Sequence, residues 1–388
     1  MRTPAAKHGT HDPSRLARVG ERIEADIATG RYDGAALRVA QRGELIYDGV
    51  HGYADRAAGR ALGADDVFVS MSIGKQFTNV AVLDRIERGQ LALGTQVADL
   101  LPAFRRPELR PITLFHLLTH TSGLLAAVPQ VPPDVFMDTA RLTAFVAALG
   151  PESRPGERVN YSIIAAHAVL AEVVKAADGG ERPYAQILAE DLFTPLGMRD
   201  TSLGGRADLV ARACPVVARY SEPGLFVPQE LEGLGQLITL PGCEVPAGGF
   251  LTTIADLHRF AQMLANGGEL DGARILSPRT IACCAQNFTG DKPNGLFDYT
   301  RALRGWEPWP ANIGIGFFVR GQGVTPGPIG NFCSPSTFCG WGAGSTCFWI
   351  DPQSGVTFSF LSTGLMEDSH HIQRLQCLAD LVMSALTE

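Results

Sequence analysis

Residues 72–89 read SIGKQFTNVAVLDRIERG, and this run has the apolar spacing of an α-helix. Its apolar side chains recur every three or four positions, at Ile73, Phe77, Val80 and Leu83. Ser72 and Lys75 are three residues apart, so both side chains lie on one side of the predicted helix. Free backbone N–H groups and the positive end of the helix dipole gather in its first turn. We therefore expect an oxyanion to be stabilised near Ser72, and the ammonium form of Lys75 to be disfavoured, so that Lys75 acts as a base.

The basic residues of the chain support this role for Lys75. Only four of the 33 basic residues are lysines, namely Lys7, Lys75, Lys175 and Lys292. Arginine keeps its proton in a protein, whereas a lysine can be tuned to release it. The alternative is that Ser72 only caps a helix and that Lys75 is solvated, because a Ser-x-x-Lys spacing by itself also arises by chance.

Two further stretches carry chemistry. Tyr161 lies just before an apolar run at residues 164–174, and a tyrosine at such a loop–helix junction can reach into a cleft. If a neighbouring lysine stabilises its phenolate, it can exchange a proton with a serine hydroxyl; the alternative is an ordinary half-buried tyrosine.

Residues 340–346 read GWGAGST. Glycines on an edge strand let a substrate approach the backbone and expose N–H groups to an oxyanion. The alternative is a tight hairpin that needs small residues for its turn and has no role in catalysis.

The remaining pattern predicts one antiparallel sheet with a large helical insertion. The terminal strands can bury their apolar faces only by sharing a sheet, with the helical middle beside it. A site is expected in the cleft between the two parts. In chain order we expect a helix at 13–30, strands at 35–41 and 45–50, a mostly helical middle at 72–266, strands at 313–319, 347–350 and 356–361, and a helix at 369–386.

These motifs, in this order, resemble the serine β-lactamase and penicillin-binding-protein superfamily, and within it the class C β-lactamase-like branch that includes the family VIII carboxylesterases. Residues 112–124, ITLFHLLTHTSGL, are similar to the ITxxxLLTHTSGL signature of that branch. Residues 245–256, VPAGGFLTTIAD, are similar to its PAGG-x-x-ST-x-x-D segment. The resemblance makes His120 and Ser122 structural, because the HTSG stretch shapes a loop in this family.

The resemblance runs from about residue 14 to the C-terminus and implies a β-lactamase/transpeptidase-like fold of the α/β (α+β) class. An antiparallel sheet built from N- and C-terminal strands would be flanked by helices and would carry a large, mostly helical inserted subdomain. We expect a single catalytic domain over residues 1–388. Its α/β part would span about 13–71 plus 312–388, and its helical part about 72–311.

Site roles follow from the same resemblance. Ser72 matches the acylated nucleophile and Lys75 the group that activates it. Tyr161 matches the tyrosine of the Y-x-N motif, which takes part in proton shuttling. The backbone N–H groups of Ser72 and of a residue near Ala343 would form the oxyanion hole.

Two departures from the family pattern concern the substrate. Ile163 stands where the Asn of Y-x-N is expected, and Gly340-Trp341-Gly342 stands where relatives have Lys-Thr-Gly or His-x-Gly, in a register defined only to within one residue. The missing Asn and Lys would hold the amide and carboxylate of a β-lactam, so their replacements make a poor site for an anionic lactam or peptide. We expect Ile163, Gly340, Trp341 and Gly342 to contact the substrate and to favour a neutral ester.

The leading hypothesis is thus a serine carboxylesterase acting on small to medium esters through an acyl-enzyme on Ser72. An acyltransferase or amidase would use the same acyl-enzyme with another acceptor. A β-lactamase or D,D-peptidase is disfavoured by Ile163, by the missing lysine and by the lack of an export signal. A non-catalytic relative would have no need to keep Ser72, Lys75 and Tyr161 together, and no G-x-S-x-G elbow supports an α/β-hydrolase.

Residues 298–336 combine many Gly and Pro residues with large aromatic side chains, among them Trp306, Trp309 and Phe318. We expect part of this segment to overhang the cleft and to shape an apolar pocket with Trp341. The alternative is a surface insertion packed on itself.

Composition narrows the other possibilities. A chain of 388 residues with 45% hydrophobic residues can bury a large core, and a net charge of −7 does not support nucleic-acid binding. The eight cysteines lack CxxC or His-spaced metal patterns, so we expect reduced core thiols, no metal and no cofactor.

No run of 18 apolar residues and no N-terminal signal region is present, so we expect no membrane span and a cytoplasmic location. The expected partner is a small-molecule ester; the oligomeric state stays open.

Overall fold

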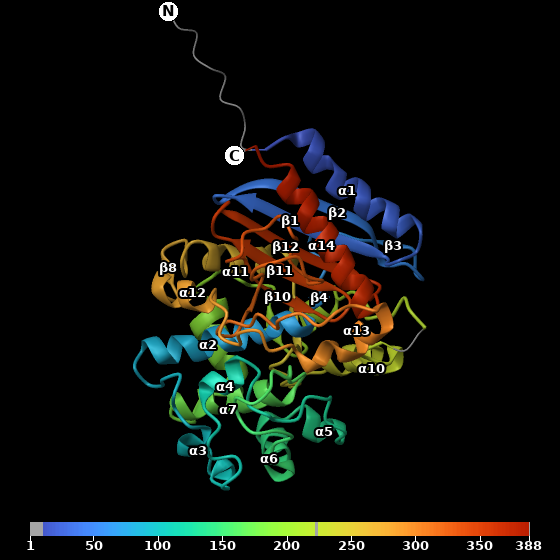
Figure 1. The fold of residues 1–388 in the computed structure, drawn as a ribbon. Helices are drawn as coiled ribbons and strands as arrows, with labels where there is room; N and C mark the ends of the chain where they lie inside the picture. The colour runs from blue at the N-terminus through green and yellow to red at the C-terminus, as the bar shows by residue number, and fades with distance from the viewer. Residues whose placement is uncertain (1–10, 222–223, 388) are drawn as a thin grey trace, which may run out of the picture.

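A seven-stranded antiparallel sheet forms the centre of the computed structural model, which describes residues 11–221 and 224–387 (Figure 1). The strand order is β3-β2-β1-β12-β11-β10-β9, so the N-terminal and C-terminal strands meet in one sheet. They join where β1 pairs with β12, from Gly34 opposite Thr363 to Gln41 opposite Val356. The expected fold class is therefore confirmed. The strands are β1 (Gly34–Gln41), β2 (Glu44–Asp55), β3 (Arg60–Ala61), β9 (Phe318–Val319), β10 (Phe338–Gly342), β11 (Thr346–Asp351) and β12 (Val356–Thr363).

Each face of this sheet has its own apolar core. The terminal helices α1 (Pro13–Ala28) and α14 (Asp368–Ser384) lie side by side over one face, whereas α11 (Ile254–Ala265) packs under β11 and β12 (Figure 1). Successive side chains of β12 point to opposite faces of the sheet and so contribute to both cores: Phe360 packs toward the terminal helices and Leu361 toward the other face.

The helical region begins with α2 (Gly74–Glu87), which lies below the sheet (Figure 1). Within residues 11–221 and 224–387, no helix combines the length and apolarity needed to cross a bilayer. The expected division into an α/β part (13–71 plus 312–388) and a helical part (72–311) stays a prediction. Residues 1–10, 222–223 and 388 of the expected domain lie outside the described ranges. The other helices are α3 (Val97–Leu100), α4 (Leu114–Leu118), α5 (Pro133–Phe136), α6 (Thr139–Leu149), α7 (Ala165–Ala177), α8 (Tyr184–Leu188), α9 (Ala207–Val210), α10 (Pro228–Ile238), α12 (Pro278–Cys284) and α13 (Asp298–Arg304).

Smaller elements connect these helices. Three short strands, β4, β5 and β6, form a second sheet in the order β4-β6-β5, and β7 pairs with β8. The short strands are β4 (Phe68–Val69), β5 (Ser202–Leu203), β6 (Phe250–Thr252), β7 (Glu269–Leu270) and β8 (Ala273–Arg274); the short helical turns are η1 (Met71–Ile73), η2 (Pro102–Phe104), η3 (Ala189–Phe193) and η4 (Gly295–Phe297).

Three expected elements differ in the structure. The strand expected at 45–50 is longer, because β2 spans Glu44–Asp55. Ser72 lies in the 3₁₀ turn η1 directly before α2, not in the first turn of the α-helix itself. The strand expected at 313–319 is wrong over most of its length, because only Phe318–Val319 is paired as a strand. Gly316 interrupts it with a φ of 80°, and its carbonyl accepts hydrogen bonds from Gln76 and Asn79 instead of joining a ladder.

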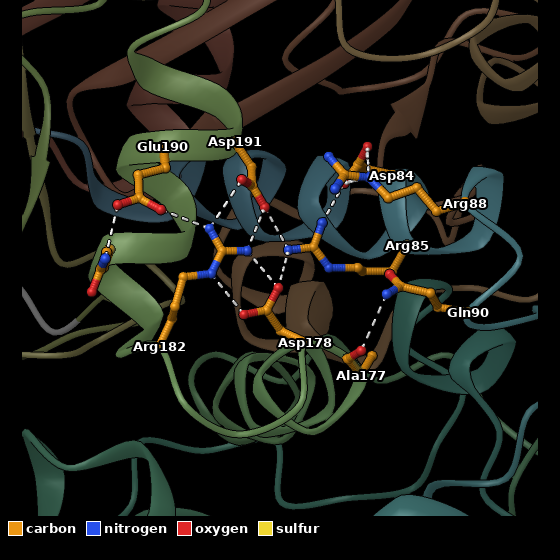
Figure 2. Close-up of polar contacts among 10 residues, drawn as sticks. Asp84, Arg85, Arg88, Gln90, Ala177, Asp178, Arg182, Glu190 and Asp191 are labelled. Atoms are coloured by element: carbon orange, nitrogen blue, oxygen red, sulfur yellow. Dashed lines mark hydrogen bonds and ion pairs between the residues drawn. The ribbon is translucent and has the colours of Figure 1, made fainter.

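The far end of α2 is held by a buried network of charges (Figure 2). Arg85 is 1% exposed, and its Nη2 lies 3.0 Å from an Asp178 oxygen and 2.5 Å from an Asp191 oxygen. A second guanidinium, from Arg182, contacts the same two carboxylates. Asp178 caps the C-terminal end of α7 and Asp191 lies in η3, so this network ties α2 to both of these elements.

Replacement of Arg85 tests the strength of this anchor. Arg85→Met should lower the free energy of unfolding by about 3 kcal/mol, because it removes the buried guanidinium that pairs with two partly buried carboxylates. Arg88→Met is the matched control: this guanidinium is 49% exposed and pairs with Asp84, so the cost should stay below about 1 kcal/mol. Urea denaturation measures both. Equal losses in the two variants would contradict a special role for Arg85.

Candidate active site

Ser72 is presented by a tight turn that only small neighbours allow. The residue before it, Met71, has a φ of 49°, a left-handed conformation that is costly for a side chain of this size. A Cβ added at Gly342 would lie 2.6 Å from the Ser72 nitrogen, and one at Gly248 would lie 2.7 Å from the Met71 oxygen. The glycines of two sequence motifs thus let β10 and the 245–249 segment run directly against the serine turn.

Lys75 is fully buried beside this serine. Its Nζ lies 3.1 Å from Ser72 Oγ and donates to the carbonyl oxygens of Ile163 at 2.8 Å and Ala247 at 3.0 Å. Burial lowers the pKa of Lys75 well below its usual value. A neutral amine has two N–H groups and one lone pair. With both N–H groups on backbone carbonyls, the lone pair is left for the Ser72 hydroxyl.

Tyr161 completes a cluster of three side chains from distant segments. It is 5% exposed, and it lines the same cavity as Ser72. Burial raises the pKa of Tyr161 well above its usual value, and the nearby Ser72 side chain offsets only part of this. The structure therefore favours a phenol in the free protein, in contrast to the lysine-stabilised phenolate considered from the sequence; Lys75 Nζ lies 4.9 Å from the ring centroid.

The loop that carries Tyr161 is held by His120. The two rings stack with centroids 4.2 Å apart, and the Ser162 N–H donates to His120 Nδ1 at 3.1 Å. Burial, and then the nearby Lys75, lower the pKa of His120 to about 3, so Nδ1 stays available as an acceptor. Ser122 Oγ accepts from the Leu124 N–H in the adjoining turn. Both contacts fit the loop-shaping role that the resemblance implies for His120 and Ser122.

Five of the predicted residues line one cavity that opens to solvent. They are Ser72, Tyr161, Ile163, Trp341 and Ala343. Ala343 follows β10 directly, and β9 pairs only with Phe338 and Cys339, so the end of β10 next to Ser72 is an edge on that side. The N–H groups of Ser72 and Ala343 stay the predicted oxyanion donors.

Gly340 and Gly342 are not among the residues that line this cavity. Gly342 approaches the Ser72 backbone, and Gly340 packs so closely on the Gln76 side chain that a Cβ would collide with it. Both glycines support the site from behind through close packing, so their expected contact with substrate stays a prediction.

Five other residues line the cavity, and four of them were missed by the sequence analysis: Leu225, Phe226, Leu296 and Asp368. Leu225 and Phe226 lie in an irregular connection before α10, where no periodic pattern marks them. Phe318 belongs to the aromatic segment 298–336 that was singled out. Asp368 begins α14 one residue before the predicted start of that helix, and no sequence pattern marks it as a cavity residue.

Segment 298–336 reaches the cavity only in part. Phe318 lines it, with its ring stacked 5.6 Å from that of Tyr161. Trp309 lies one layer further back, because it stacks on Phe297, and Phe297 in turn stacks on Trp341. Trp306 packs on the edge of Trp309. The two tryptophans therefore support the cavity wall from behind.

Comparisons of this chain with family models and with relatives point to the same family, and comparison with solved structures points to the same fold. The family model described as Beta-lactamase matches residues 19–379. Penicillin-binding protein 4 of Amycolatopsis lactamdurans is 31% identical over 319 residues, which cover 76% of this chain and 77% of that protein. Esterase EstB of Burkholderia gladioli is 35% identical over 205 residues, 48% of this chain and 51% of that protein. A crystal structure of a family VIII carboxylesterase superposes with a TM-score of 0.78 at 21% identity, covering 96% of this chain and 98% of that one.

Proposed function

Because this chain belongs to the beta-lactamase family, we propose that it is a serine hydrolase of the esterase type, a carboxylesterase that cleaves small to medium esters. The observation that carries the proposal is the 3.1 Å contact between Lys75 Nζ and Ser72 Oγ at the floor of a largely apolar cavity. Ile163 and Trp341 line that cavity at or beside positions where relatives hold polar groups for a lactam. The likeness to an esterase over about half the chain supports the same substrate class.

The proposed reaction has two steps on one serine. Ser72 Oγ attacks the ester carbonyl while its proton passes to the neutral amine of Lys75. The backbone N–H groups of Ser72 and Ala343 stabilise the oxyanion, and the alcohol leaves with a proton delivered through Tyr161 and Lys75. Water then attacks the acyl-enzyme, gives its proton to the same pair, and releases the acid.

The test compares an ester with a β-lactam on the same protein. We expect p-nitrophenyl butyrate to be hydrolysed with a kcat/KM at least about 100-fold above that for nitrocefin, because Ile163 offers no amide to a lactam. Dominant nitrocefin turnover would contradict the esterase assignment.

A matched pair of variants at Ile163 sharpens this comparison. Ile163→Asn introduces the missing amide and should raise nitrocefin turnover relative to the ester by about tenfold, the value of one added hydrogen bond. Ile163→Leu changes shape without adding a polar group and serves as the control. An equal change of the ratio in both variants would show that cavity shape, not the amide, sets the preference.

A further inference from the structure

One titratable side chain, Asp368, lies in the cavity without a role in the proposed reaction. Asp368 is 5% exposed and lines the same cavity as Ser72, in a wall that is otherwise mostly apolar. Within residues 11–221 and 224–387, no cationic side chain forms an ion pair with it. A buried carboxylate without a cation is costly unless something compensates its charge.

The surroundings of Asp368 add negative charge rather than neutralise it. Glu367, next in the chain and 4% exposed, caps α14 and lies 3.6 Å from Arg304. The Arg304 guanidinium therefore pairs with Glu367, and within the described residues Glu367, not Asp368, is the carboxylate that it neutralises. Burial, and then the charge of Glu367, raise the pKa of Asp368 to about 7, while a hydrogen bond from the Gly344 backbone lowers it. The two acids also raise the pKa of the nearby Tyr220, after the larger effect of burial.

The other walls of the cavity suit an organic cation. Four aromatic side chains line it together with Asp368, namely Tyr161, Phe226, Phe318 and Trp341. Aromatic rings attract ammonium groups through their negative faces, and they desolvate an alkylammonium at little cost because its methyl groups are apolar. Lys75 does not oppose such a ligand, since burial favours its neutral form.

We propose that the esters this site prefers carry an alkylammonium group, which binds between the Asp368 carboxylate and the aromatic rings of the cavity. This inference rests on the proposed esterase function and narrows its substrate class. An anionic ester would meet uncompensated negative charge instead, so it is rejected. The competing structural role is that Asp368 only stabilises the first turn of α14 through the helix dipole, which would affect stability but not substrate choice.

The experiment uses two thioesters of equal shape. Butyrylthiocholine carries a trimethylammonium group, and S-(3,3-dimethylbutyl) thiobutyrate replaces its nitrogen by carbon. The native protein should prefer the cationic ester in kcat/KM by about tenfold or more, and Asp368→Asn should reduce this preference by about tenfold. Asp298→Asn is the matched control, because that carboxylate is 65% exposed and the change in net charge is identical.

The outcomes separate the two proposals. Hydrolysis of both thioesters without preference for the cation, or a preference that survives in Asp368→Asn, overturns the cation site and leaves the esterase function standing. Failure to hydrolyse either thioester or p-nitrophenyl butyrate counts against the esterase function. Calorimetric titration with tetramethylammonium then tests the cation site independently of turnover: binding should weaken at least about tenfold in Asp368→Asn, and absence of binding to the native protein overturns the inference.

The pH dependence of the preference gives a readout that a purely structural Asp368 would not change. The carboxylate is ionised above its raised pKa, so the cationic-to-neutral ratio should grow between pH 6 and pH 8. The groups facing Asp368 are Glu367 on α14, Tyr161 and Tyr220, with Arg304 acting through Glu367. Effects of Lys75 and Tyr161 on the chemical step cancel in the ratio. A ratio that stays flat over this range contradicts the proposal.

Discussion

Ser72→Ala is expected to abolish covalent labelling by a fluorophosphonate and to lower ester turnover by about 10⁴-fold or more. The variant removes the one oxygen that can form the acyl-enzyme, while the backbone N–H of residue 72 and the cavity walls remain. Substrate binding should therefore survive with little change in affinity. Labelling stoichiometry by mass spectrometry and single-turnover kinetics measure these effects separately.

The control for this variant is another buried serine of the same region. Ser122 lies in the turn beneath the Tyr161 loop, where its Oγ accepts a hydrogen bond from Leu124. Ser122→Ala should keep full labelling, with at most a modest loss of stability. Labelling that persists in Ser72→Ala would mean that a different side chain is the nucleophile, and it would remove the basis of the proposed reaction.

Lys75→Arg is the second large effect, with an expected loss of about 10³-fold in turnover although the positive charge is retained. Arginine cannot release its proton near neutral pH, so it cannot accept the proton of Ser72. In the native protein, the rate of fluorophosphonate labelling should rise with pH as Lys75 loses its proton, with a midpoint well below the usual lysine pKa. The Arg variant should lack this rise.

Two further variants support the interpretation of Lys75→Arg. Lys75→Met has a side chain of similar length but without charge, and its ester turnover should be similarly low. A similar loss in both variants shows that the missing base, and not the larger size of arginine, causes it. Lys175→Arg changes a half-buried lysine that pairs with Glu172 at 2.9 Å, so it should leave turnover intact. Substantial activity in Lys75→Arg, with a native melting temperature, would refute the base role.

The local spacing of apolar residues in the sequence was enough to predict much of the fold. Strand β1 and helix α14 lie within one residue of their expected starts, because alternating or helical runs of apolar residues have a single way to bury. The strand expected at 313–319 failed because glycines within it made turns, and such turns depend on partners such as Asn79 that are more than 200 residues away.

The site divides in the same way. Ser72, Lys75 and Tyr161 could be nominated from motifs, because the chemistry requires these residue types in a particular order. Their roles as nucleophile, base and proton donor are still predictions to be tested by the variants above. The sequence also pointed to Ile163 and Trp341 as places where the site departs from its relatives.

What the sequence alone determined is the fold class, and it nominated the candidate side chains for acyl transfer, since both depend on residue type and short spacing. Only the tertiary structure decided that Lys75 donates to the carbonyls of residues 163 and 247, that burial raises the pKa of Tyr161, and that Asp368 lines the cavity. These properties depend on burial and on neighbours from remote segments. A pKa or a cavity wall is the product of desolvation and packing, and no local run of residues encodes either.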